Sequence, residues 1–100
     1  MKIIGTGRSH PSLVVTNEML SQILDTSDEW ITTRTGIKER RIISSENLED
    51  LAIDAAKKAL ADANMEAKDL DYIICANVVN EFISPAMSCL IQGAIGANCP

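Results

Sequence analysis

The stretch LEDLAIDAAKKALADAN, residues 48–64, decides the fold, because it carries the strongest periodic signal in the chain. Leucine and alanine recur at intervals of three and four residues, and acidic residues and lysines occupy most of the other positions. This spacing predicts an amphipathic helix with one buried face. Ser45 or Asn47 is its expected start, and Asn64 is its expected left-handed stop. Since alanine dominates the buried face, the helix backbone can approach its partner closely.

Beyond this helix, the sequence predicts a buried strand and a second helix. Residues 72–79 form a nearly continuous apolar run after a polar turn, which is typical of a strand buried on both faces of a parallel sheet. Ser84 and Pro85 are expected to cap and begin a helix over residues 86–95, which Gly96 ends. That helix is apolar almost all round, so we expect it to be buried on every side.

Before the long helix, the chain is predicted to form short elements. Residues 2–7 are expected to form a short strand that ends in a glycine turn. Residues 17–24 show helical spacing of apolar residues, with Asn17 as the N-cap. Residues 38–43 are expected to be extended.

The strongest local signal before the long helix lies in residues 25–33. Thr26 and Glu29 fit a capping box, in which a hydroxyl caps the helix and a carboxylate three residues later reaches back. Thr32 is β-branched and Gly36 can end a helix, so the predicted helix is short.

The order of these elements, strands and helices in succession, predicts an α/β fold. A helix buried all round needs covering on both sides, and one strand with two helices cannot supply it. The expected domain is therefore incomplete, and a further parallel strand should come next. An unusual small α/β module is the alternative interpretation.

The composition fits a globular protein and excludes some function classes. Of the 100 residues, 46% are hydrophobic but only 3% are aromatic, so the core should be aliphatic. A net charge of −5, with nine lysines and arginines, argues against nucleic-acid binding. Four positive charges nevertheless gather within eight residues, which suits a phosphate-bearing small ligand: Arg34, Lys38, Arg40 and Arg41.

The number of cysteines and the lengths of the apolar runs bear on the cellular compartment of the protein, but they identify no reaction. Cys75, Cys89 and Cys99 are too few and too irregular for a disulfide scaffold. Cys75 and Cys89 fall in predicted buried elements, so we expect inert thiols, and His10 is the one histidine available as a base. The apolar run at the start of the sequence is too short for a signal peptide. No apolar stretch is long enough to span a membrane. We therefore expect a cytoplasmic protein without a metal site or a membrane partner.

Trp30 and Arg34 are the candidate binding residues. They are four residues apart and so lie on one face of the predicted short helix. An indole and a guanidinium can together clamp a flat heteroaromatic ring, and Thr26 adds a hydroxyl one turn earlier. The alternative is that Trp30 covers the core and that Arg34 is solvated, and spacing alone favours this second interpretation.

Two strings identify a family resemblance. KIIGTG at residues 2–7 and DTSDEWITTRTGIKER at residues 25–40 resemble the start of β-ketoacyl-acyl-carrier-protein synthase III, the condensing enzyme that initiates type II fatty acid synthesis. The likeness continues through Ala55-Ala56, the run at residues 73–74 and PAMSCLIQ at residues 85–92. It covers the whole chain.

The resemblance implies a thiolase-like fold in a homodimer and a decarboxylative Claisen condensation. An acyl group passes from coenzyme A to an active-site cysteine, and malonyl-acyl-carrier protein then attacks the thioester. The family's catalytic Cys, His and Asn have no counterparts in residues 1–100. The chain is thus expected to be the N-terminal portion of the first thiolase-like half, without catalytic residues or a resident cofactor, and inactive alone.

The resemblance also changes the interpretation of the clamp. Thr26, Trp30 and Arg34 match the family positions that hold the nucleotide of coenzyme A, with the indole on adenine and the other two in polar contacts. Asn77 and Ser84 depart from the family pattern near the primer pocket, so the primer's length and branching stay open. A relative with another condensation (quinolone, polyketide starter or hydroxymethylglutaryl-CoA) or a stand-alone nucleotide-binding module are the alternatives.

One expectation concerns association. A strand at residues 72–79 with an open edge, and a helix at residues 86–95 without full cover, expose unpaired backbone and apolar surface. We expect the isolated chain to self-associate.

Overall fold

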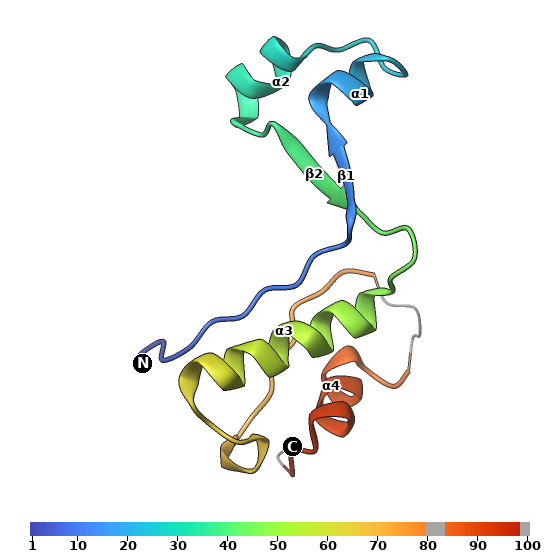
Figure 1. The fold of residues 1–100 in the computed structure, drawn as a ribbon. Coiled ribbons are helices and arrows are strands. Elements are labelled where there is room, and N and C mark those ends of the chain that lie inside the picture. The colour runs from blue at the N-terminus through green and yellow to red at the C-terminus, as the bar shows by residue number, and fades with distance from the viewer. Residues whose placement is uncertain (80–83, 99–100) are drawn as a thin grey trace. The chain divides into compact units, whose positions relative to one another are not determined.

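The computed structural model describes residues 1–79 and 84–98, which divide into two compact units (Figure 1). Residues 10–45 form the hairpin unit, and residues 1–9 with the chain from residue 46 onward form the helical unit. The elements follow in the order β1 (Leu13–Thr16), α1 (Asn17–Ser21), α2 (Asp28–Thr35), β2 (Glu39–Ile42), α3 (Leu48–Ala63), the 3₁₀ turn η1 (Ala67–Asp69) and α4 (Met87–Ile95).

An antiparallel ribbon of β1 and β2 forms the base of the hairpin unit. Leu13 lies opposite Ile42 and Thr16 opposite Glu39. The prediction of an extended segment at residues 38–43 is confirmed by β2. The two short helices α1 and α2 lie between the paired strands in the sequence (Figure 1).

Both short helices begin one residue away from the predicted cap. The hydroxyl of Thr16, not Asn17, accepts from the backbone N–H of Met19 at 3.2 Å. In α2, the hydroxyl of Ser27, not Thr26, accepts from the N–H of Trp30 at 3.1 Å. The predicted caps were wrong because two hydroxyl or amide residues stand side by side at each start, and any of them has the chemistry of a cap.

Gly36 ends α2 as predicted, with a φ of 73° that a residue with a Cβ rarely adopts. Its N–H donates to the carbonyl of Thr32 at 2.8 Å, which closes the last turn. The chain then passes directly into β2.

The helical unit is organised around α3, which has the predicted ends. Asn47 caps it by accepting from the N–H of Asp50 at 2.8 Å, and Asn64 ends it at a φ of 54°. The N-terminal segment lies directly on this helix: a Cβ added at Gly7 would be 2.4 Å from the carbonyl oxygen of Ala55 and from the nitrogen of Ala59. The expected close approach of the alanine face is therefore confirmed, and glycine is the residue that permits it.

Neither of the strands predicted in the helical unit has a partner. Residues 2–7 and 72–79 are not part of a β-ladder, and the one sheet among the described residues is β1–β2. Tyr72 and Ile74 are exposed by 67% and 86%, so the expectation of burial on both faces is wrong for this chain. A run rich in β-branched residues becomes a strand only where a neighbouring strand accepts its hydrogen bonds.

Helix α4 is shorter and more exposed than predicted. It begins at Met87 after Ala86, so Ser84 and Pro85 do not cap and begin it. Met87 and Ile91 are buried, but Cys89 is exposed, and the helix therefore has one buried face instead of being covered all round. That face packs on α3, the helix that contacts it.

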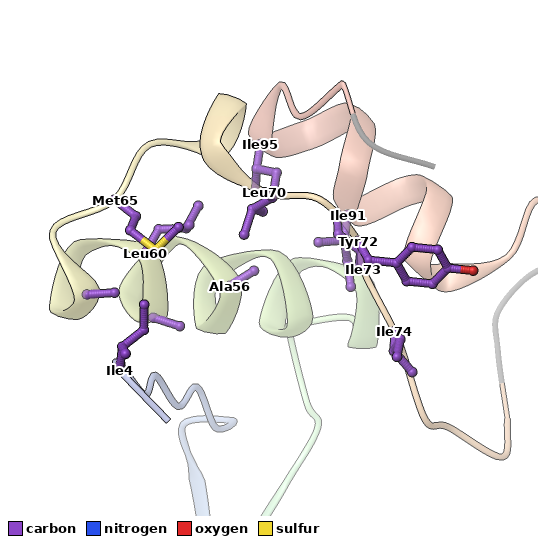
Figure 2. A pocket seen from close by; sticks show the side chains of 13 residues that line it. Ile4, Ala56, Leu60, Met65, Leu70, Tyr72, Ile73, Ile74, Ile91 and Ile95 are labelled. Carbon is purple, nitrogen blue, oxygen red and sulfur yellow. The ribbon is translucent and has the colours of Figure 1, made fainter. Parts of the chain in front are cut away.

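An apolar groove of about 420 Å³ lies in the helical unit (Figure 2). Aliphatic side chains line it from the N-terminal segment, α3, the extended segment 72–79 and α4; they include Ile4, Leu60, Ile73 and Ile91. Within residues 1–79 and 84–98, no helix has the length and apolar character needed to cross a membrane.

Candidate functional site

The exposed face of α2 is the candidate site. The guanidinium carbon of Arg34 lies 4.6 Å from the centroid of the Trp30 ring, and Trp30 is 54% exposed. This distance is that of a cation–π contact. The predicted pairing on one helix face is confirmed, and the alternative in which Trp30 covers a core is wrong.

A shallow pocket of about 370 Å³ surrounds this pair. Its walls are Ser27, Glu29, Trp30, Thr33 and Arg34. Two hydroxyls, a carboxylate, a guanidinium and an indole face provide stacking, hydrogen-bond donors and one fixed positive charge. Such a set suits a flat heteroaromatic ring that carries polar substituents and a nearby phosphate.

Thr26 lies apart from this pocket. It lines a neighbouring hollow of about 550 Å³, to which Lys38 contributes a second cation. Ser27 lines both hollows. Among the described residues, the Thr26 hydroxyl oxygen is buried and has no hydrogen-bond partner. The structure therefore brings Trp30 and Arg34 together and places Thr26 in the adjoining hollow.

A polar cluster around the buried Asn17 lies behind α2, and the sequence interpretation did not include it. The amide nitrogen of Asn17 donates to Asp28 Oδ1 at 2.8 Å and to the carbonyl of Ile37 at 2.7 Å. Its amide oxygen accepts from Arg40 Nη2, while Arg40 Nη1 donates to the carbonyl of Val15 at 3.0 Å. No local pattern reveals this cluster, since only the pairing of β1 with β2 brings Asn17 and Arg40 together.

The cluster divides the four cations of the sequence into two pairs. Arg40 is engaged by Asn17, and Arg41 donates to the carbonyl of Pro11 at 3.3 Å. Arg34 and Lys38 line the two hollows. This second pair lies beside the Trp30 face, whereas Arg40 and Arg41 bond to other parts of the hairpin unit.

The cysteines show no activated nucleophile within the described residues. Cys75 Sγ lies 3.8 Å from the amide oxygen of Asn77, which is not a base. Cys89 is exposed, which corrects the prediction that it is buried. His10 Nδ1 is 3.4 Å from the carbonyl of Pro11, and Cys99 lies outside the described residues. No cluster of three or more potential metal ligands occurs within residues 1–79 and 84–98.

Comparisons with known proteins extend over nearly the whole chain. The β-ketoacyl-[acyl-carrier-protein] synthase III of Clostridium botulinum strain 657 is 50% identical over 97 residues, which are 97% of this chain and 30% of that protein. The crystal structure of 3-oxoacyl-[acyl-carrier-protein] synthase III from Aquifex aeolicus VF5 superposes with a TM-score of 0.90 at 50% identity, covering 97% of this chain and 32% of the other.

A third similarity is to a priming β-ketosynthase of the R1128 polyketide biosynthetic pathway. Its crystal structure gives a TM-score of 0.88 at 30% identity over 97% of this chain and 29% of the other. No family model matches the sequence. The resemblance to β-ketoacyl-acyl-carrier-protein synthase III and the thiolase-like α/β fold class are confirmed, and the chain spans about 30% of the length of these relatives.

Acid is expected to destabilise the hairpin unit through Asp28. Hydrogen bonds from Asn17 and then Thr32 lower the pKa of this carboxyl below its ordinary value of 3.8. A lowered folded-state pKa gives stability that is fully present above the ordinary pKa and is lost as the pH falls through the folded value. Urea unfolding followed by the fluorescence of Trp30, the one tryptophan, should thus show a falling midpoint below about pH 4.

Asp28→Asn should flatten that fall, because the amide does not titrate. Asp54→Asn is the matched control: the pKa of Asp54 is also lowered, chiefly by Lys58, but this carboxyl lies in the helical unit. An equal acid response of Trp30 in the wild type and in Asp28→Asn would contradict the assignment.

Proposed function

We propose that this chain is part of a condensing enzyme of the β-ketoacyl-acyl-carrier-protein synthase III type, and that the outer face of α2 binds the nucleotide end of its acyl-CoA substrate. The observation that carries the proposal is the stacked and exposed pair of Trp30 and Arg34 at 4.6 Å, on a chain 50% identical to such synthases. A flat ligand that stacks on the exposed indole would cover part of its apolar surface.

The proposed roles follow from the chemistry of each side chain. Trp30 presents a flat π surface to adenine, and Arg34, already stacked beside it, supplies a fixed charge for a phosphate. Thr26 lines the adjoining hollow, and its hydroxyl would contact the ligand only after the side chain turns to expose it. These contacts would hold the nucleotide end of the substrate. Residues outside this chain would act on its thioester.

The reaction of the whole enzyme is a decarboxylative condensation. The acyl group is transferred from the sulfur of coenzyme A to a cysteine, releasing the free thiol; malonyl-acyl-carrier protein then loses carbon dioxide, and its carbanion displaces the cysteine to give a 3-oxoacyl product. We assign this chain to the N-terminal portion of the first thiolase-like half of a cytoplasmic homodimer. Acyl-CoA is a substrate here, and no resident cofactor is part of the proposal.

One alternative has an observation of its own. The similarity to the priming β-ketosynthase of a polyketide pathway, with a TM-score of 0.88, favours a synthase that condenses a different primer. The same nucleotide face serves both reactions, because both proposals differ at the acyl end of the substrate. The sequence departs from the family pattern at Asn77 and Ser84, and we expect these two residues to bear on which primer is accepted.

Coenzyme A is expected to bind the isolated chain weakly and through Trp30. One stacked base contributes about 1–3 kcal/mol, and one or two phosphate contacts add little more in water, so a Kd of about 1 mM is expected. An NMR titration that follows the Trp30 indole N–H, supported by calorimetry, measures it. Trp30→Ala should abolish saturable binding, whereas Tyr72→Ala, at an aromatic that is 67% exposed in the helical unit, should not. Equal binding by Trp30→Ala and the wild type would refute the site.

The purified chain is expected to catalyse no condensation. With acetyl-CoA and malonyl-acyl-carrier protein, a radiolabel assay should detect no 3-oxoacyl product above a protein-free blank, because the described thiols lack a base. Product formation that scales with chain concentration would overturn this part of the proposal.

Self-association is the expected state of the isolated chain. The segment 72–79 is uncharged and forms no β-ladder with the described residues, and Ile74 and Val78 on it are 86% and 100% exposed. A second copy can pair with it along the open backbone edge without like-charge repulsion.

Light scattering at high concentration should therefore give a mass at or above twice 10.8 kDa. A lysine in this segment, Val78→Lys, should shift the mass toward one chain, since a charge opposes pairing of the segment with a second copy. Ile23→Lys, at a residue that is 78% exposed in the hairpin unit, is the matched control and should leave the mass unchanged. A mass of 10.8 kDa for the wild type would contradict the prediction of self-association.

A further inference from the structure

We infer that Asn17 is a positioning residue: its buried side chain holds α2 on the hairpin and so fixes the Trp30–Arg34 pair for the nucleotide. The contribution of Asn17 to nucleotide binding rests on the proposed function. Its structural role, which is to hold α2, rests on the geometry alone. It assigns a role to a residue that contacts α2 on the side opposite the Trp30–Arg34 pair and that lines the same hollow as Thr26.

The first step is that Asn17 holds the chain that leaves α2. Its backbone N–H donates to the carbonyl of Lys38 at 3.1 Å, and its side-chain amide donates to the carbonyl of Ile37 at 2.7 Å. Both acceptors follow Gly36 directly. With 1% of its surface exposed, Asn17 makes these bonds without competition from water.

The second step is that Asn17 holds the body of α2. The same amide nitrogen donates to Asp28 Oδ1 at 2.8 Å and lies 3.4 Å from the hydroxyl of Thr32, which itself donates to Asp28 at 3.1 Å. Asp28 and Thr32 are one turn apart on one side of the helix. Trp30 and Arg34 are offset from them by two residues, about 200° around the axis, and therefore occupy the opposite side.

The third step is that apolar packing does not hold α2 in place. Of the eight residues of α2, all described, none is buried. A helix without a buried face is held by its polar contacts, since it gains little from the hydrophobic effect. The bonds of Asn17 are the ones that join α2 to the rest of the unit at both of its ends.

The fourth step is that only an amide in one orientation fits. Arg40 has donors alone, so its bond to Asn17 requires the amide oxygen on that side, and the nitrogen must then face Asp28 and Ile37. An aspartate at this position would keep the contact with Arg40. It would lose both donors and set a carboxylate against that of Asp28.

The test uses the full chain and reads the ring directly. In Asn17→Asp, the indole N–H resonance of Trp30 should shift and broaden as α2 loses its fixed position, and the affinity for coenzyme A should fall about tenfold, the loss expected when buried groups are left unpaired. Amide resonances of α3, in the helical unit, should stay in place. Arg40→Lys, which keeps the charge but loses one of the two contacts, should give a smaller shift of the same kind.

A charge exchange separates positioning from general destabilisation. Asn17→Asp combined with Asp28→Asn restores a donor facing an acceptor at unchanged net charge, and the Trp30 resonance should return toward its wild-type place. Asn47→Ala removes the cap of α3, a bond of equal length at 2.8 Å, and should lower stability without moving the Trp30 resonance.

Two outcomes would overturn the inference: an unmoved Trp30 resonance in folded Asn17→Asp, or no recovery in the double variant. If Asn17→Asp unfolds the whole hairpin unit, Arg40→Lys and the double variant still decide between these outcomes. Should the wild type fail to bind coenzyme A while the Trp30 resonance responds as described, the nucleotide site is wrong and the positioning role stands.

Discussion

The hairpin unit depends on one buried amide. Asn17 joins two segments that are distant from it in the sequence, the first turn of α2 at Asp28 and the chain entering β2 at Ile37, and it also accepts from Arg40 on β2. Leaving its donors unpaired would cost about 1–3 kcal/mol each in a buried setting, which is large for a segment with little apolar core. The exposed face of α2 can then be given over to ligand groups, because the fold does not need that face for packing.

The helical unit depends on a different constraint, the close approach of backbone to backbone. Gly5 and Gly7 lie against the alanine face of α3, where a Cβ would come within 2.4–2.8 Å of helix atoms. Small residues on both sides of this contact let the N-terminal segment lie directly on the helix. The segment and the helix therefore pack closely. Larger aliphatic side chains such as Ile4 and Ile74 remain at the rim of the groove and are exposed by 59% and 86%.

Sequence reasoning succeeded where the signal was local. The ends of α3 at Asn47 and Asn64, the stop at Gly36 and the shared face of Trp30 and Arg34 all follow from spacing within a few residues. It missed the caps of α1 and α2 by one residue, because neighbouring residues have equivalent capping chemistry, and it failed where the outcome depended on distant partners. The apolar run 72–79 has the composition of a strand, but strand formation requires a hydrogen-bonded neighbour. The role of Asn17 was missed for the same reason, since its partners lie 11 to 23 residues away.

These two kinds of stabilisation bear differently on the proposed site. The hairpin unit closes its polar cluster with residues of its own, from Asn17 to Arg40, so the geometry of Trp30 and Arg34 does not rely on the apolar groove being covered. The helical unit leaves aliphatic surface exposed, and its stability therefore responds to whatever covers that surface. The proposed nucleotide-binding face lies on the unit that closes its own polar cluster, so its form does not depend on how the aliphatic surface of the other unit is covered. Under the proposal, binding of the nucleotide end of the substrate is thus physically separate from assembly of the hydrophobic core.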